Sequence, residues 1–145
     1  MILHRLPLGG SVGPARDVPT ICIPFSDGYE GVSDTLAGLL PHTSPRVLIL
    51  LAGATGPGLE RIEGEVADYE DAEHKLLLLG LSPGVGFAET ANVASTAVSG
   101  DLVLVAVGVG VGPEWLDRLS SAAQCDSTVV SATALGDQAL SLIHI

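Results

Sequence analysis

Apolar and polar positions alternate in blocks along most of the chain, and the spacing within each block predicts its secondary structure. Short, continuous apolar runs of the kind found in buried strands cover residues 18–25, 46–52, 75–79, 102–107 and 128–135. Between these runs, apolar residues recur every three or four positions, as on a helix with one buried face. Such helices are expected near residues 31–40, 59–69, 87–98 and 113–119. The repeated alternation predicts an α/β fold, a Rossmann-like βαβαβαβαβ arrangement with a mostly parallel sheet and helices on both faces.

Proline residues and the apolar spacing refine the helix boundaries and faces. Pro41 is expected to end the first helix. Pro113 is expected to be the first residue of the last helix, because proline is well tolerated at that position. In the third helix the spacing predicts an inward face made of Phe87, Ala91, Ala94 and Val98.

The two ends of the chain differ from this pattern. Residues 1–17 are rich in glycine and proline and show no periodicity, so we expect a flexible N-terminal tail there. Residues 18–139 then form one domain. The last six residues, LSLIHI, resemble the in-frame translation of a sequencing adapter. We therefore expect residues 140–145 to be non-native and the natural protein to continue past about residue 139.

Composition and charge narrow the class of partner. Six Lys and Arg against seventeen Asp and Glu give a net charge of −11, which argues against nucleic acid or an anionic membrane surface. The chain is 47% hydrophobic but only 3% aromatic, so its core is expected to consist of Leu, Val and Ala, as in parallel sheets covered on both faces. No apolar run reaches the ~18 residues of a membrane span, and the start lacks the apolar segment of a secretory signal. Cys22 and Cys125 are expected to be reduced thiols, and the protein to be cytoplasmic.

Loops after the strands are the candidate site, because ligands of parallel sheets bind beyond the carboxyl ends of the strands. Asp27 lies in the first of these loops, where its carboxylate can reach a ligand, cap the following helix or form an Asx turn. The four histidines are scattered, and the sequence shows no metal-ligand spacing, Cys/His pair or Gly-x-Ser-x-Gly motif. We therefore predict no metal site and no catalytic residue.

A glycine-rich turn after the second predicted strand offers one function. Gly53-Ala54-Thr55-Gly56 is similar to the turn of NAD(P)-binding short-chain dehydrogenases. That pattern requires a glycine where this chain has Leu59, and it follows the first strand rather than the second. The Ser/Tyr-x-x-x-Lys catalytic set is also missing, since the only lysine is Lys75. A dinucleotide-binding domain remains the alternative interpretation.

Three longer segments of the sequence favour a different function from dinucleotide binding. VPTICIPFSDGYEGVSDTLAGLLPHT (residues 18–43), SPGVGFAETANVASTAVSGDLVLV (82–105) and VGPEWLDRLSSAAQCDSTVVSATAL (111–135) follow one another in the order and spacing of a known family. The chain from residue 18 to about 135 resembles the N-terminal half of family 2 glycosyltransferases of the GT-A fold, most closely the bacterial rhamnosyltransferase-like members. Such enzymes transfer a sugar from a nucleoside-diphosphate sugar to a glycan acceptor, and intact relatives use Mg²⁺ or Mn²⁺.

The resemblance also implies a binding site and shows where this chain departs from the family. The implied nucleotide-sugar site comprises Pro24, Phe25, Ser26, Asp27, Ala52, Gly53, Gly86, Asn92, Ala106 and Gly108. The family places an Asp pair where this chain has Ala52 and Gly53, and Asp-x-Asp where it has Ala106-Val107-Gly108. Because those carboxylates hold the divalent ion, their loss is expected to cost orders of magnitude in rate. The resemblance therefore implies a weak or non-catalytic donor site in a truncated half-domain that exposes surface for self-association.

Overall fold

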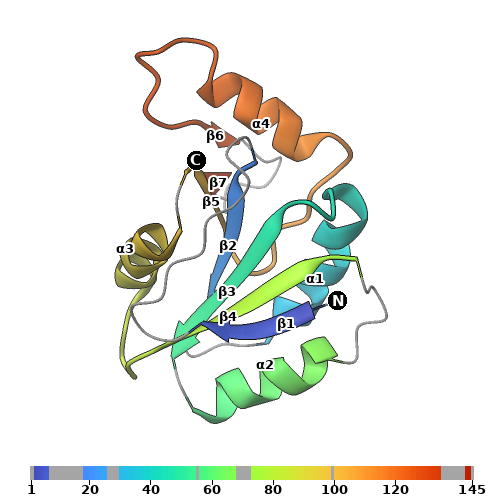
Figure 1. Cartoon of the computed structure of the whole chain (residues 1–145), viewed down its shortest axis with the longest axis vertical. Helices are drawn as coiled ribbons and strands as arrows, with labels where there is room; N and C mark the ends of the chain where they lie inside the picture. Colours follow the sequence, from blue (N-terminus) through green and yellow to red (C-terminus); the bar gives the residue numbers. More distant parts are fainter. Residues whose placement is uncertain are drawn as a thin grey trace.

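The computed structural model describes residues 2–6, 18–25, 30–54, 56–67, 73–98, 100–134 and 143–144. The strands are β1 (Ile2–Leu6), β2 (Thr20–Phe25), β3 (Leu48–Ala54), β4 (Lys75–Leu81), β5 (Leu102–Val105), β6 (Thr133–Ala134) and β7 (Ile143–His144). The helices are α1 (Val32–Leu39), the short 3₁₀ helix η1 (Leu40–His42), α2 (Pro57–Ala67), α3 (Phe87–Ala97) and α4 (Trp115–Ala123). The predicted α/β class with a mostly parallel sheet is confirmed (Figure 1).

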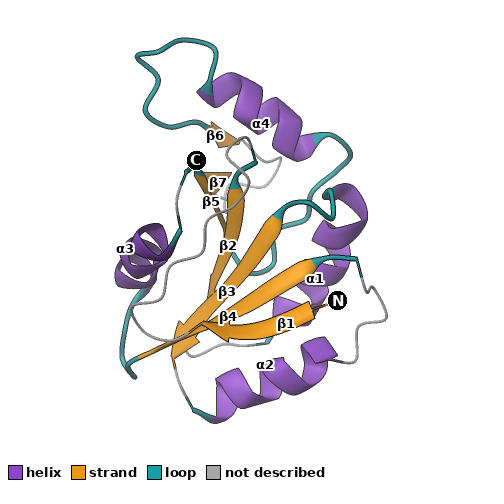
Figure 2. Cartoon of the chain, in the orientation of Figure 1, coloured by secondary structure: helices purple, strands orange, loops and turns teal. Residues whose placement is uncertain are grey.

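One sheet organises the molecule, with strand order β1-β4-β3-β2-β5-β7-β6. Strands β1, β4, β3, β2 and β5 are parallel, whereas β7 is antiparallel to both of its neighbours, β5 and β6 (Figure 2). From β2 the chain adds β3 and β4 on one side, and then returns through α3 to place β5 on the other side of β2. The strand order therefore reverses between β2 and β5. We call the carboxyl ends of these two strands the switch point, where α/β sheets commonly bind ligands.

Each face of the sheet has its own apolar core. One core joins alternate residues of β2 to β5, such as Ile23 and Leu51, to the inner sides of α1, α2 and α4. The other joins the intervening residues, such as Cys22 and Leu50, to α3 through Ala94. Figure 1 shows α3 on one side of the sheet and α1 and α2 on the other. Burial on both faces explains why the strands are continuous apolar runs in the sequence.

The N-terminal residues differ from the expected tail. Residues 2–6 form β1, which pairs in parallel with β4 along Leu76 to Leu79, so the prediction of a tail is wrong for these residues. An unpaired edge of β4 would expose a row of N–H and C=O groups, and β1 satisfies them. Glycine and proline lie mainly in residues 7–17, and that part of the predicted tail lies outside the described residues.

The C-terminal region also differs. Of the strand predicted over residues 128–135, the described part (residues 128–134) pairs only at Thr133 and Ala134, and Val130 is 95% exposed. A long strand needs a covered apolar face, and most of residues 124–131 are exposed. Within residues 140–145, which were expected to be non-native, Ile143 and His144 form β7 and pair with β5 and β6. They complete the edge of β5 that would otherwise stay unpaired.

Two helices begin or face differently from the prediction. Helix α4 begins at Trp115 rather than Pro113, because Glu114 has a left-handed backbone (φ 59) that interrupts the helical run. Helix α3 buries Thr90, Ala94 and Ala97, whereas Phe87 is 48% exposed, so its predicted inward position is wrong. In the part of the chain that the structure describes, no helix combines the length and apolarity that a membrane crossing requires.

Candidate functional site

Four of the predicted site residues meet at the carboxyl ends of two neighbouring strands. In the register of β2 and β3, Pro24 lies beside Ala52 and Phe25 beside Gly53. Pro24 and Ala52 are buried, and Ala52 belongs to the core beneath α3. The Phe25 side chain is 5% exposed and lies in the core beneath α1 and α2. The sheet therefore brings the four residues together, but the side chains of Phe25 and Ala52 point into the two opposite cores.

The backbone of Gly53 lies very close to the Phe25 ring at this end of the sheet. A Cβ atom on Gly53 would overlap three carbons of the Phe25 ring. Because the ring is buried and held by the core, it has no free space into which it could swing. Ala52 is fully buried on the opposite face. Neither position can hold a solvated carboxylate, since a buried and unpaired carboxylate is strongly unfavourable.

Strand β2, which lies between the two cores, also contains a buried thiol, that of Cys22. Cys22 of β2 is fully buried, and desolvation raises the pKa of the thiol from 9.0 to about 12. A thiol with this pKa stays protonated at neutral pH and cannot act as a nucleophile. Cys125, by contrast, lies exposed after α4.

The β5–α4 loop (residues 106–114) runs from the switch point along α1. The hydroxyl of buried Thr35 accepts a hydrogen bond from the Gly108 N–H (2.8 Å) and donates one to the Gly31 carbonyl (2.7 Å). A methyl group on Gly31, the residue that precedes α1, would lie only 3.2 Å from Val107 Cγ1. The start of the loop is therefore attached to the first turn of α1.

A second threonine, Thr43, connects the other end of the β5–α4 loop, at Trp115, to α1. The Thr43 hydroxyl accepts a hydrogen bond from the Trp115 Nε1–H (3.2 Å) and donates one to the Leu39 carbonyl (2.7 Å). The Thr43 carbonyl in turn accepts a hydrogen bond from the Nε2–H of buried His74 (2.8 Å). Thr35 and Thr43 thus use their hydroxyls in the same way, each joining a helical carbonyl to the segment that follows β5.

The residues that follow β5 offer no side chain for a metal. Ala106 and Val107 are half-buried and apolar, and Gly108 has a left-handed backbone with φ 90. Among the described residues, no three side chains of His, Cys, Asp or Glu are grouped so that they could hold a metal ion. The described residues therefore supply no set of side-chain ligands for the divalent ion that the resemblance implies. Ser26 and Asp27, predicted to belong to this site, lie outside the described residues.

The two remaining predicted site residues lie apart from the switch point. Gly86 is exposed and follows β4, which is separated from β2 by β3. Asn92 is exposed on α3 and lines a cavity of about 380 Å³ between α3 and β5, together with Leu102, Leu104 and Val130. The structure does not bring Asn92 together with the residues that end β2 and β3.

The glycine-rich turn follows β3, one strand away from the switch point. Gly56 has a positive φ (142), as a tight turn requires, and Thr55 lies outside the described residues. Leu59, at the position where the dinucleotide pattern has its last glycine, is 3% exposed and belongs to the core beneath α2. A bulky side chain occupies the place where that motif needs close packing between helix and strand.

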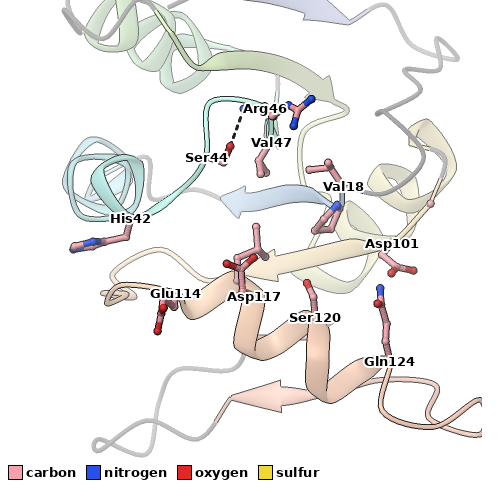
Figure 3. A pocket seen from close by; sticks show the side chains of 13 residues that line it. Val18, His42, Ser44, Arg46, Val47, Asp101, Glu114, Asp117, Ser120 and Gln124 are labelled. Carbon is pink, nitrogen blue, oxygen red and sulfur yellow. Dashed lines mark hydrogen bonds between the residues drawn. The ribbon is translucent and has the colours of Figure 1, made fainter.

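A larger cavity, of about 600 Å³, opens at the amino ends of the strands, at the other end of the sheet from the switch point. It lies between the amino ends of β2 and β3 and helix α4, and Figure 3 shows Val18 and Val47 facing Asp117 and Ser120 across it. Its volume suits a small ligand. Its charged side chains are exposed, and they combine one cation with acidic groups: Arg46, Asp101, Glu114 and Asp117.

Comparison with protein-family models, with curated proteins and with solved structures finds no match to this chain. The function must therefore be argued from the fold and the site. Sequence reasoning missed Thr35, within the first predicted helix, and Thr43, just after it, because a threonine at either place has no distinguishing sequence signal. The glycine pair Gly31 and Gly108 was visible in the sequence, but the contact between their loops was not.

Proposed function

We propose that this chain is a nucleotide-sugar-binding half-domain of the family 2 glycosyltransferase type in which the donor site has lost its metal and diphosphate chemistry. Its ligand is a nucleoside-diphosphate sugar or the nucleotide part of one, bound weakly and without a divalent ion. It serves as a non-catalytic domain beside a glycan-modifying activity. We place the protein in the cytoplasm, where nucleotide sugars are made.

The observation that carries the proposal is the way the chain fills both carboxylate positions of the family. Gly53 lies against the Phe25 ring, Ala52 is buried on the α3 face, and Ala106 and Gly108 carry no ligand atom in their side chains. The strand order β4-β3-β2-β5 supports the assignment, because it creates the switch point at the ends of β2 and β5. In this proposal, core packing replaces charge at Ala52 and Gly53, whereas Ala106 and exposed Gly108 simply lack the carboxylates.

Without these carboxylates the reaction of the relatives has no stabilisation for its leaving group. Departure of a nucleoside diphosphate places negative charge on the β-phosphate, and a bound cation or a set of fixed donors must offset it. The chain carries a net charge of −11, and its six basic residues are Arg5, Arg16, Arg46, Arg61, Lys75 and Arg118. Of these, Arg61 pairs with Glu65 within α2, and Arg118 pairs with Glu114, the residue before α4. Binding without turnover is therefore the expected behaviour.

Calorimetric titration with UDP, GDP and dTDP, each with and without Mn²⁺, tests this proposal. We expect one nucleotide to bind weakly, with the same affinity in both conditions. An affinity that rises tenfold or more with Mn²⁺ would show that other groups replace the missing carboxylates. The absence of binding by all three nucleotides would refute the assignment of a nucleotide ligand.

A matched pair of variants locates the site. Placing Asp at both Ala106 and Gly108 supplies the missing carboxylates, and placing Asn at the same two positions supplies similar volume without charge. Both residue types tolerate the left-handed backbone at Gly108 better than other side chains do. If the switch point is the donor site, the double Asp variant gains Mn²⁺-dependent nucleotide binding and the double Asn variant does not. Equal behaviour of the two variants would place the ligand elsewhere.

The alternative, an NAD(P)-binding domain, has less support. Its glycine-rich turn follows β3 instead of β2, and Leu59 fills the place of its last glycine. A titration of NADH and NADPH followed by their fluorescence separates the two functions. A change in cofactor fluorescence that is lost when Gly56 is replaced by Val would favour the alternative.

A further inference from the structure

The cavity of about 600 Å³ at the amino ends of the strands has charges of opposite sign on its two walls. Arg46, just before β3, belongs to one wall, and Asp101, just before β5, and Asp117 of α4 belong to the other (Figure 3). Among the described residues, no ion pair joins Arg46 to either carboxylate. The cavity therefore keeps a cation and two anions apart, with their charges available to a ligand.

Hydrogen bonds hold the two walls in place. The Trp115 Nε1–H at the start of α4 donates to the hydroxyl of Thr43, in the segment between η1 and β3 (3.2 Å), so the two walls are joined directly. Within that segment the Val47 N–H donates to the Ser44 carbonyl (3.0 Å), in the turn that carries Arg46. Because these contacts exist before a ligand arrives, binding requires less ordering of the protein than a mobile surface would.

The floor between the walls is apolar. Val47 is 2% exposed and Leu116 is 9% exposed, and half-buried Val18 and Pro19 extend the same surface. The volume falls within the range of about 300–1,000 Å³ that is typical of small-molecule sites. A molecule that covers this floor removes apolar surface from water, so the middle of the ligand is expected to be apolar.

We propose that this cavity binds a zwitterion of the size of a short peptide. Its carboxylate pairs with Arg46, with which it can form two parallel hydrogen bonds, and its ammonium group pairs with Asp101 and Asp117. Glu114 also lines the cavity, but its carboxylate already pairs with Arg118 (3.5 Å). A ligand with one charge would leave the opposite wall without a partner. The site lies at the other end of the sheet from the switch point, so this inference goes beyond the proposed function and does not depend on it.

The test uses the tripeptide Ala-Leu-Ala and two blocked forms of it, on the full chain. N-acetylation removes the positive charge of the peptide, and C-amidation removes the negative charge. Arg46→Gln removes the cation of the cavity, and the double variant Asp101→Asn/Asp117→Asn removes the two anions at similar volume. Asp34→Asn is the matched control, because Asp34 is an exposed acid on α1 that does not line the cavity.

NMR titration gives both the place and the strength of binding. We expect Ala-Leu-Ala to shift the amide signals of Val47, Leu116 and Ser120, and each blocked form to bind about two- to fivefold more weakly, as for an exposed ion pair. Arg46→Gln should weaken binding of the free peptide by a similar factor and leave binding of the amidated peptide unchanged, because that peptide has no carboxylate.

The anionic wall should show the converse dependence. The double variant Asp101→Asn/Asp117→Asn is expected to weaken binding of the free peptide and to leave binding of the acetylated peptide unchanged, because that peptide has no ammonium group. Asp34→Asn should alter none of the affinities.

Three results would overturn the inference. The first is the absence of saturable shifts at the amides that line the cavity. The second is equal affinity for the free and the blocked peptides, which would show that the charges are not used. The third is an Arg46→Gln variant that binds the amidated peptide more weakly, since Arg46 would then act through the fold and not through the ligand's carboxylate. The nucleotide titrations concern the other end of the sheet, so each of these results leaves the proposed function standing.

Discussion

Replacing Gly53 with Ala tests whether the Phe25 ring closes the end of β3, the packing on which the proposed loss of the donor site rests. The new methyl group would overlap the ring of Phe25, a side chain that is only 5% exposed. If the neighbouring residues shift to make room, overpacking of this kind costs about 1–3 kcal/mol. If the ring is expelled, it loses roughly 150 Å² or more of burial, worth about 4 kcal/mol at about 25 cal/mol per Å². Replacing glycine also lowers the conformational entropy of the unfolded chain, which stabilises the folded protein by about 0.5–1 kcal/mol. The net loss of folding stability is therefore expected to be about 2–3 kcal/mol.

Urea denaturation followed by the fluorescence of Trp115, the single tryptophan, measures this cost. With a slope of about 2 kcal/mol per M, typical of small proteins, the midpoint should fall by about 1–1.5 M. Gly64→Ala is the matched control. Gly64 lies exposed in α2 with nothing within 4 Å of an added Cβ, so this variant should gain about 0.5–1 kcal/mol in stability.

A partner variant shows whether the Phe25 ring is the cause. Phe25→Leu in the Gly53→Ala background removes part of the ring and should recover some of the lost stability, whereas the two changes would add if they were independent. A Gly53→Ala variant within 0.5 kcal/mol of wild type would refute the reasoning. It would mean that the carboxylate position at the end of β3 is open and that its loss in this chain has no structural cause.

Four further outcomes are expected from the contacts and the pKa shift described above. Cys125 should react with a thiol reagent in the native protein and Cys22 only after denaturation, because burial raises the pKa of Cys22 to about 12. This pKa lies above the value of 9.0 that the thiol has in the unfolded chain. The stabilisation from the Cys22 thiol is therefore complete below pH 9 and is lost as the pH rises from there toward 12. Urea midpoints measured across this pH range test the loss. Thr43→Val should cost about 1–3 kcal/mol and shift the emission of Trp115, whose indole N–H loses its acceptor. Gly31→Ala should lower the thermal midpoint, because φ 87 and the nearby Val107 both oppose a side chain; an unchanged midpoint would contradict the loop contact.

Several elements of the fold could be predicted because they are encoded locally. The strands near residues 18–25, 46–52, 75–79 and 102–107 are apolar runs that two covered faces require, and the structure has β2 to β5 there with ends that differ by up to two residues. The apolar spacing near residues 59–69 predicted a helix there, and α2 buries Leu59, Ile62 and Val66 at that spacing. Phe87 was misassigned because apolar spacing alone cannot tell which side of a helix meets the sheet.

The site was predictable only in part. The absence of carboxylates at Ala106 and Gly108 and at Ala52 and Gly53 was readable from the sequence, given the resemblance. The reason that no charge fits at Gly53 depends on Phe25 lying beside it, which follows from the register of β2 and β3. Register between strands far apart in the chain is set by the whole core, so a local pattern cannot supply it.

The sequence by itself determined the fold class, the acidic charge, the apolar composition of the core and the residues available for chemistry, because each of these follows from local spacing or from counting. Tertiary structure alone decided which strand flanks which, and therefore where the switch point lies. It also brought β1 to one edge of the sheet, placed β7 between β5 and β6, and joined Thr35 to Gly108 across seventy-three positions of sequence. Such contacts depend on how the sheet and helices close around two cores, since hydrogen bonds between distant residues form only where packing has already brought the chain together.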